Sequence, residues 1–416
     1  MRRAETIERL YLDFDGFFAS VMQQADPRLR GRPVGVIPFD GSAADATVVI
    51  ACSKEAKARG CSNVMRVPDA RAICPDIVLV TQRPDLYRRA HNTLINEITC
   101  EIPIETVKSI DELCCILDTA TIAEPEALAA RIKTRIHESV GDQITCSIGF
   151  AANRLLAKVA CKMDKPNGVT IWHPAAMPAP LLPHGIDVIP GIGTRMQARL
   201  QAAGIVTMEH LWNSQPKHLR AIWHSVNGER MWYALHGYDV YAQPTERGMY
   251  GHGRVLPPQE RDSKSVAKFS RVLLTKAARR MRRDGFFASK LELALDMRQG
   301  VWYGARDLPS VRDDPAVLAA LAQLWDKADR EIRPRHEIIR VFVNLSELSP
   351  GNARQLDLLI NDDDERQKCE VLTDTIDTLN RKFGKRVLTL GEWSPPGDYA
   401  GAKIAYNRIP SAEDFL

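Results

Sequence analysis

The sequence predicts an α+β protein built from several domains. Short apolar strands mix with amphipathic helical stretches over the first 172 residues, a helical stretch follows, and strands and helices alternate again after residue 246. A length of 416 residues leaves room for about two to four domains of ordinary size. Hydrophobic residues make up 45% of the chain and charged residues 26%, which is the balance of a globular protein and excludes a disordered or fibrous one.

Hydrophobic periodicity defines the elements of the first domain. The predicted strands span residues 9–16, 33–38, 46–52, 76–80, 111–118 and 144–150, and the predicted helices span residues 124–140 and 153–163. A proline-rich crossing at residues 173–185 cannot continue a helix or a central strand, so it is expected to be a linker. A helical domain then runs to about residue 238.

A second hinge is expected at residues 242–248, and the part beyond it has a βαββαβ order. Its predicted strands span residues 249–257, 286–298, 301–308 and 336–348, and its predicted helices span residues 263–285 and 314–332. The tail from Ser349 holds a polar stretch, a helical stretch and an end that contains proline and glycine.

The cysteines and the apolar runs indicate the cellular compartment in which the protein is expected. The chain has nine cysteines, and no two of them form a C-x-x-C pair. Most of them lie in apolar runs, where a free cysteine behaves as a small buried hydrophobic residue; examples are Cys74, Cys114, Cys115 and Cys146. They predict a reducing cytoplasm. Because no signal core and no run of ~20 apolar residues is found, the chain is expected to be neither exported nor inserted into a membrane. The formal charge of +4 identifies no partner by itself.

Two segments place acids where a strand ends or is interrupted. In YLDFDG, alternation puts Tyr11, Asp13 and Asp15 on one face, although a solvated edge strand or capping aspartates would give the same pattern. In KSIDELCCILD, Asp111 and Glu112 interrupt an apolar run, where unpaired buried carboxylates are costly. Both can reach one site only at a turn or bend, or if each addresses a different side of a metal pair, and an ordinary β-turn is the alternative.

A third segment, SIGFAANRLLAKVACKMDKPNG, contains a strand, a turn, a helix with Lys158 and a KPNG turn with Lys165. Lysines in such places are usually only solvated. Beside an acidic, metal-binding strand end, however, a cation suits the phosphates of a nucleotide.

Taken together, the three segments resemble the palm of Y-family DNA polymerases, and the resemblance covers nearly the whole chain. The motifs are closer to the DNA polymerase IV type than to the UmuC type. The resemblance implies a right-hand fold. The implied domains are a palm at residues 1–25 and 80–172, fingers at 26–79, a helical thumb at 173–240, a little finger at 246–348 and a tail at 349–416.

The resemblance also implies the chemistry of the site. Asp13, Asp111 and Glu112 would bind two Mg²⁺ ions, with the carbonyl of Phe14 completing one site, for transfer of a nucleotide to a primer 3′-OH. Phe18 would be the steric gate that excludes ribonucleotides. The implied nucleotide-binding residues are Phe17, Phe18, Lys54, Lys57 and Lys165.

The chain departs from the family in the fingers and beside the expected base pair. Lys54 and Lys57 stand where the family usually has a tyrosine and an arginine, and a lysine is a point charge without the planar fork of arginine. Gly16 and Val64 also differ from the usual residues there, so no lesion preference is inferred.

Two segments are expected to hold DNA. Gly191 and Gly193 in PGIG resemble a helix-hairpin-helix turn that presents backbone N–H groups to a phosphate, and a plain helix C-cap is the alternative. Residues 263–283 carry eight basic residues and no acid, which indicates either a solvated face or a phosphate-binding one. The expected DNA contacts of this helix are Arg279, Arg280 and Arg283.

The tail contains a peptide that resembles the bacterial sliding-clamp-binding motif. Its residues are Gln355, Leu356, Leu358 and Leu359, with Leu359 in place of the usual phenylalanine, and a random amphipathic pentapeptide is the alternative. The implied partners are primer-template DNA, deoxynucleoside triphosphates and the clamp β subunit, and the chain itself is expected to be a monomer.

The expected function is translesion DNA synthesis in DNA repair. The nearest alternative is a catalytically weak or inactive Y-family-like accessory protein that recruits other polymerases, but such relatives lose the acids that are present here. A nucleotidyl cyclase shares the palm and does not need a basic third domain. A pure DNA-binding protein has no use for Asp111 and Glu112 inside an apolar run.

Overall fold

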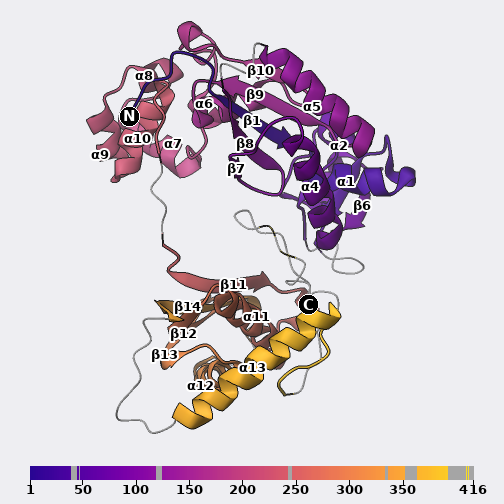
Figure 1. Cartoon of the computed structure of the whole chain (residues 1–416), viewed down its shortest axis with the longest axis vertical. Helices are drawn as coiled ribbons and strands as arrows, with labels where there is room; N and C mark the ends of the chain where they lie inside the picture. The colour runs from indigo at the N-terminus through magenta and orange to yellow at the C-terminus, as the bar shows by residue number, and fades with distance from the viewer. Residues whose placement is uncertain are drawn as a thin grey trace. The chain divides into compact units, whose positions relative to one another are not determined.

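The computed structural model describes residues 1–38, 45, 47–118, 124–241, 246–332, 336–351, 363–391, 409 and 411. The chain forms two compact units, the first mainly Met1–Gln243 and the second mainly Pro244–Lys403 (Figure 1). Both units contain helices and sheets, which confirms the α+β class. Across the described ranges, no helix is long and apolar enough to cross a bilayer.

A five-stranded sheet with the order β10-β9-β1-β8-β7 forms the centre of the first unit. The strands are β1 (Arg9–Phe14), β7 (Thr106–Val107), β8 (Glu112–Ile116), β9 (Cys146–Ala151) and β10 (Val169–Ile171). β1 runs antiparallel to β8 and to β9, and β10 runs parallel to β9. The two motif strands β1 and β8 are therefore direct neighbours.

The alternation of side chains along β1 separates two cores. Leu10, Leu12 and Phe14 lie in the core that is filled by α1 (Phe17–Ala25), α4 (Pro84–Thr99) and α5 (Pro125–Ser139). Tyr11 lies in the core on the opposite face, together with α6 (Arg154–Met163) and the helices that follow residue 186. The predicted division of this strand into an apolar face and a face with Tyr11 is confirmed.

Helix α6 crosses β9 at very close range. A Cβ at Gly149 would lie 2.2 Å from the carbonyl oxygen of Ala157 and 2.3 Å from the nitrogen of Cys161, so no larger residue fits there without movement of the helix. Gly149 is also the β9 partner of Tyr11 on β1. The close crossing consequently brings Lys158 of α6 to 5.1 Å from the centre of the Tyr11 ring.

The predicted fingers segment forms a small α/β layer with its own core. Its elements are β2 (Val34–Ile37), β3 (Val48–Val49), β4 (Ala51–Cys52), α2 (Lys54–Ala58), β5 (Met65–Arg66), α3 (Val67–Ile73) and β6 (Val78–Thr81). Three of the strands pair in the order β4-β2-β6, and β3 pairs with β5. The predicted strand at residues 46–52 is divided at Ile50, since β3 pairs with β5 whereas β4 pairs with β2.

The helical segment that follows the palm packs on α6. Its helices are α7 (Thr194–Ala202), α8 (Met208–Trp212), α9 (Pro216–Trp223) and α10 (Val226–Leu235). Their buried residues share a core with α6, and this core includes the fully buried Leu181. The proline-rich crossing therefore contributes a buried residue to this core.

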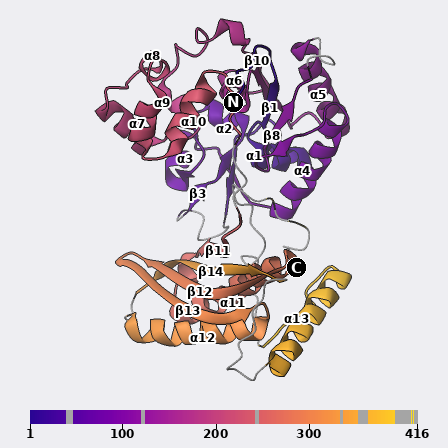
Figure 2. The same cartoon turned by 60° about the vertical axis from the view of Figure 1, so that its left-hand side comes forward.

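The second unit has the predicted βαββαβ order and an antiparallel sheet with the strand order β11-β14-β12-β13. Its elements are β11 (Met249–Val255), α11 (Ser263–Arg283), β12 (Phe286–Met297), β13 (Gly300–Val311), α12 (Asp314–Glu331) and β14 (Ile338–Pro350). One core contains the buried residues of both helices and of the sheet, and Figure 2 shows the helices beside it. The tail adds α13 (Asp363–Phe383), which contacts α12.

Candidate active site

Three acids, Asp13, Asp111 and Glu112, lie where β1 ends and β8 begins. Asp13 is the direct cross-strand partner of Glu112 in the β1–β8 register. Asp111 lies in a bend just before β8, which is the geometry that two adjacent acids need in order to reach one site. The backbone nitrogen of Phe14 donates to the carbonyl of Asp111 at 2.8 Å, and this bond fixes the bend against the end of β1.

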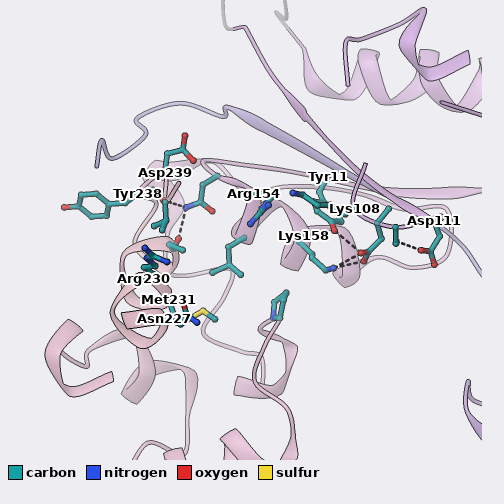
Figure 3. Close-up of a pocket in the computed structure, with 17 residues that line it drawn as sticks. Tyr11, Lys108, Asp111, Arg154, Lys158, Asn227, Arg230, Met231, Tyr238 and Asp239 are labelled. Atoms are coloured by element: carbon teal, nitrogen blue, oxygen red, sulfur yellow. Dashed lines mark hydrogen bonds and ion pairs between the residues drawn. The ribbon is translucent and has the colours of Figure 1, made fainter. Parts of the chain in front are cut away.

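Each acid already has a partner. Glu112 forms an ion pair with Lys158 at 2.7 Å and accepts a hydrogen bond from the Tyr11 hydroxyl at 3.1 Å (Figure 3). Asp13 forms an ion pair with Lys165 at 2.5 Å. Asp111 accepts from Ser109 at 2.5 Å. The acids are half-buried rather than deeply buried as the apolar run suggested, because the buried part of the run is Leu113–Cys115 and Asp111 and Glu112 precede it.

The electrostatics of the site favour a cation. The pKa of Asp13 is raised to about 6, mainly by burial; the Lys165 ammonium opposes this shift, and the carboxylates of Asp111 and Glu112 add to it. Burial lowers the pKa of Lys165, but the charge of Asp13 and its hydrogen bond to Lys165 together outweigh burial, so the pKa is raised. Asp13 is therefore a buried carboxyl group that a nearby positive charge stabilises in its ionised form.

The donor set fits a hard divalent ion, because carboxylate and carbonyl oxygens are the ligands that Mg²⁺ prefers. Within the described residues, however, no three His, Cys, Asp or Glu side chains are gathered so that they could hold a metal as they stand. Lys165, Ser109 and Lys158 occupy oxygens of Asp13, Asp111 and Glu112 respectively. A bound ion has to share these oxygens with their present partners or displace those partners.

Asp15, the second acid of the first motif, has a structural role. It is 4% exposed and accepts hydrogen bonds from Thr145, from Ser147 and from the backbone nitrogen of Asn167. Asn167 belongs to the KPNG turn, so Asp15 ties that turn to the sheet. The tie holds Lys165 near Asp13.

The two phenylalanines at the start of α1 differ in burial. Phe17 is 3% exposed and lies in the palm core, so its ring is not available to a nucleotide in this structure. Phe18 is half-buried, and its ring stacks on Tyr87 at a centroid distance of 4.5 Å. Only Phe18 of this pair keeps an accessible edge.

Gly16 brings the fingers layer up to the acidic strand end. This residue has the left-handed conformation with φ 55°, and a Cβ there would lie 2.9 Å from the carbonyl oxygen of Cys52. Helix α2 begins two residues after Cys52 with Lys54, which is half-buried, and continues with Lys57, which is exposed. The contact at Gly16 thus sets the distance between the acids and the two lysines.

The residues that were expected to bind DNA differ in their exposure and in whether other residues of the chain already bind them. Gly191 is exposed with φ 96°, and Gly193 precedes α7 with open space around it. On α11, Arg279 forms an ion pair with Asp377 of α13 at 3.2 Å, Arg280 donates to the carbonyl of Gly251 and Arg283 is exposed. The clamp-like residues Gln355, Leu356, Leu358 and Leu359 lie outside the described residues.

Acids from elsewhere in the second unit offset part of the charge of α11. The buried Arg282 forms ion pairs with Asp314 and with Asp377. The one-sided charge of this helix therefore does not require a polyanion for its own stability. The sequence of the helix alone does not reveal these partners, because Asp314 and Asp377 are distant from Arg282 along the chain.

A cavity of about 740 Å³ opens beside Asp111 and Glu112, toward α10 (Figure 3). Its lining includes three basic residues that the motif analysis missed, namely Lys108, Arg154 and Arg230. A signal was present for two of them: Lys108 lies three residues before Asp111, and Arg154 is the first residue of the helix that carries Lys158.

Comparison with known families identifies relatives along the chain. A family model described as the impB/mucB/samB family matches residues 12–162, and a model of the C-terminal domain of this family matches residues 247–358. A Moorella thermoacetica protein named DNA polymerase IV is 33% identical over 398 residues, which cover 91% of this chain and 94% of the relative. A Bacillus subtilis protein named DNA polymerase IV 1 is 28% identical over 394 residues, with 92% of each chain covered.

Solved structures share the fold. A chimera of the Y-family DNA polymerases Dbh and Dpo4 superimposes with a TM-score of 0.67 and 24% identity, covering 82% of this chain and 98% of that one. DinB from Sulfolobus solfataricus superimposes with a TM-score of 0.51 and 23% identity over the same shares. The expected multidomain right-hand fold is confirmed. The first matched segment, residues 12–162, contains all the candidate metal ligands.

Proposed function

The chain belongs to the impB/mucB/samB family, and we propose that it is a Y-family DNA-directed DNA polymerase that copies damaged template. The observation that carries the proposal is the arrangement of Asp13 opposite Glu112, with Asp111 in the bend beside them. This places three acids at one strand end, next to a cavity with basic walls. A nucleotidyltransferase needs that combination, because its reaction depends on positioning and charge compensation.

The reaction transfers a nucleotide to the primer. The primer O3′ forms a bond to the α-phosphorus while the bond to the pyrophosphate leaving group breaks. Asp13, Asp111, Glu112 and the carbonyl of Phe14 would hold two Mg²⁺ ions, which lower the pKa of the primer hydroxyl and neutralise the charge that develops on the leaving group. Lys158 remains beside Glu112 and orients it. Lys165, released from Asp13, binds a phosphate of the incoming nucleotide.

The nucleotide approaches from the side of the fingers. Phe18 closes the space beside the sugar C2′ and so favours deoxynucleotides. Lys54 and Lys57 on α2 supply further positive charge for the triphosphate, held in range by the contact at Gly16. Since neither lysine has the fork of arginine, each contributes a single charge rather than a bidentate contact.

The remaining segments hold the template and partners. The exposed turn of Gly191 and Gly193 presents backbone N–H groups to one phosphate of the duplex. Arg279, Arg280 and Arg283 of α11 add contacts to the DNA backbone, and the peptide from Gln355 to Leu359 binds the sliding clamp. The protein acts as a monomer.

Template-directed primer extension tests the proposal. Four templates that differ only in the first unpaired base should each direct incorporation of the matching deoxynucleotide, and removal of the divalent metal should stop the reaction. A fifth template with a lesion at that base tests bypass. The accessory-protein alternative instead predicts binding of every primer-template with extension of none.

A further inference from the structure

The cavity beside the acids has two chemically different ends. Asp111 and Glu112 lie at one end, and three cations also line the cavity: Lys108 before β8, Arg154 at the start of α6 and Arg230 on α10 (Figure 3). A third acid of the lining, Asp239, is paired with Arg9 at 3.0 Å. The cavity is lined by residues of the first unit alone. A ligand that fits it must carry negative charge along its length and a neutral group at the end near the acids.

The three cations are not used by the fold. Across the described part of the chain, no acceptor takes a hydrogen bond or an ion pair from the side chains of Lys108, Arg154 or Arg230, whereas Lys158 is committed to Glu112. Burial is the main cause of the lowered pKa of Lys108, and the charges of Arg154 and Lys158 lower it further, so these two cations repel Lys108. A bound anion would relieve this repulsion.

We infer that Lys108, Arg154 and Arg230 bind the phosphates of the last primer nucleotides, and that Lys108 is the residue that positions the primer 3′-OH at the acids. The inference rests on the proposed function. A primer end has the required chemistry, because its internucleotide phosphates are charged and its terminal hydroxyl is neutral. An incoming triphosphate does not, since it is charged at its far end, and Lys54, Lys57 and Lys165 do not line this cavity.

Lys108 is placed by the same turn that places the acids. Its backbone nitrogen donates to the carbonyl of Glu112 at 2.8 Å, and the next nitrogen, that of Ser109, donates to the same carbonyl at 3.2 Å. Asp111 lies inside this turn. A phosphate on the Lys108 ammonium is therefore held at a fixed offset from both carboxylates, which is what alignment of an attacking hydroxyl requires.

A neutral-linkage scan of the primer tests the inference. Methylphosphonate replaces one phosphate at a time in a primer-template, and the affinity of the wild type is measured by fluorescence anisotropy. A neutral linkage among the three nearest the primer 3′ end should weaken binding roughly tenfold. The Lys108→Ala variant should bind native DNA roughly tenfold more weakly than the wild type does. Its affinity should not fall further when the linkage to which the wild type is sensitive is made neutral. The variant should keep the KM for the nucleotide.

Two further variants complete the experiment. Lys108→Arg keeps the charge and should keep the sensitivity to the neutral linkage, and Lys217→Ala removes one exposed charge outside the cavity and should also keep it. The inference is overturned when Lys108→Ala stays as sensitive as the wild type, or when the wild type responds only to neutral linkages in the template strand. If the wild type extends no primer at all, the proposed function fails, while the binding scan still decides the inference.

Discussion

A role of Phe18 as a steric gate and a role in packing alone predict different effects of its removal on the incorporation of ribonucleotides. Its ring stacks on Tyr87, so truncation removes a packing contact whatever its function. Phe18→Ala should lower the melting temperature and should also raise the incorporation of ribonucleotides relative to deoxynucleotides, by on the order of a hundredfold if about 3 kcal/mol of steric exclusion is lost. The ratio is measured with both nucleotides on one template.

The control removes the same contact from the other side. Tyr87→Leu breaks the stack and leaves the Phe18 ring in place, so it should lower stability without changing the ratio. An unchanged ratio in Phe18→Ala as well would assign Phe18 to packing alone.

The sequence predicted the residues of the site that lie inside its motifs. Strand alternation was enough to separate Asp13 from Leu12 and Phe14, and the adjacency of Asp111 and Glu112 suggested a turn or bend as one of two possible arrangements, of which the structure has the bend. It could not predict that Asp15 is satisfied by Thr145, Ser147 and the KPNG turn, because these partners are distant in sequence. Nor could it predict the cavity of Lys108, Arg154 and Arg230, which forms only when α10 packs beside the palm.

At the scale of elements, the crossing of α6 over β9 is the most sensitive contact. Gly149→Ala places a methyl group within 2.2 Å of the Ala157 carbonyl oxygen, so the helix has to move outward. The free energy of unfolding should fall by about 1–3 kcal/mol. Nucleotide incorporation should fall as well, because Lys158 moves with the helix. Gly248→Ala is the matched control, since a Cβ there meets nothing. Equal stability of the two variants would contradict the close crossing.

Helix α11 gives a second prediction at this scale, because its arginines differ in their partners. Arg283 is exposed and has only surface contacts, with Asp284 and Ser411 at 3.4 Å each, so Arg283→Ala should leave stability nearly unchanged. It should weaken binding to all DNA sequences alike and reduce the slope of log affinity against log salt by about 1. Arg279→Ala removes the partner of Asp377 and should mainly lower the melting temperature. An unchanged salt slope in Arg283→Ala would show that this end of the helix faces solvent.

Helices α1–α4 were not predicted from the sequence. In α4, Tyr87, His91, Leu94 and Ile98 are buried at helical spacing, but polar and charged residues dominate the rest of the helix. The helical stretch of the tail was predicted, but its docking was not. Helix α13 is held by Asp377 and by ion pairs of Arg312 with Asp374 and Glu370, and such pairs leave no periodic signal.

At the scale of the whole molecule, the tail is proposed to raise processivity by tethering. Replacement of Gln355, Leu356 and Leu358 by Ala should remove stimulation by the sliding clamp and leave synthesis without the clamp unchanged, because tethering raises effective concentration without new contacts to DNA. Leu359 should make the contact weaker than a phenylalanine would, since it fills less of an apolar groove. Leu359→Phe should therefore bind the clamp more tightly. Equal clamp binding by the wild type and the triple variant, or by neither, would withdraw this partner.

The central claim is that three acids at the ends of β1 and β8 carry out metal-dependent nucleotidyl transfer. Its most direct test is the rate of single-nucleotide incorporation, with Mg²⁺ varied, for the wild type, Asp13→Ala, Asp111→Ala and Glu112→Ala, with primer-template affinity measured in parallel. Glu138→Ala, which removes an exposed acid of α5, is the control. We expect incorporation by the wild type and the control that requires the metal. For the three acid variants we expect a loss on the order of 10³-fold with affinity for DNA largely retained. Near-normal incorporation by any of the three, or incorporation by the wild type without a divalent metal, would contradict the account.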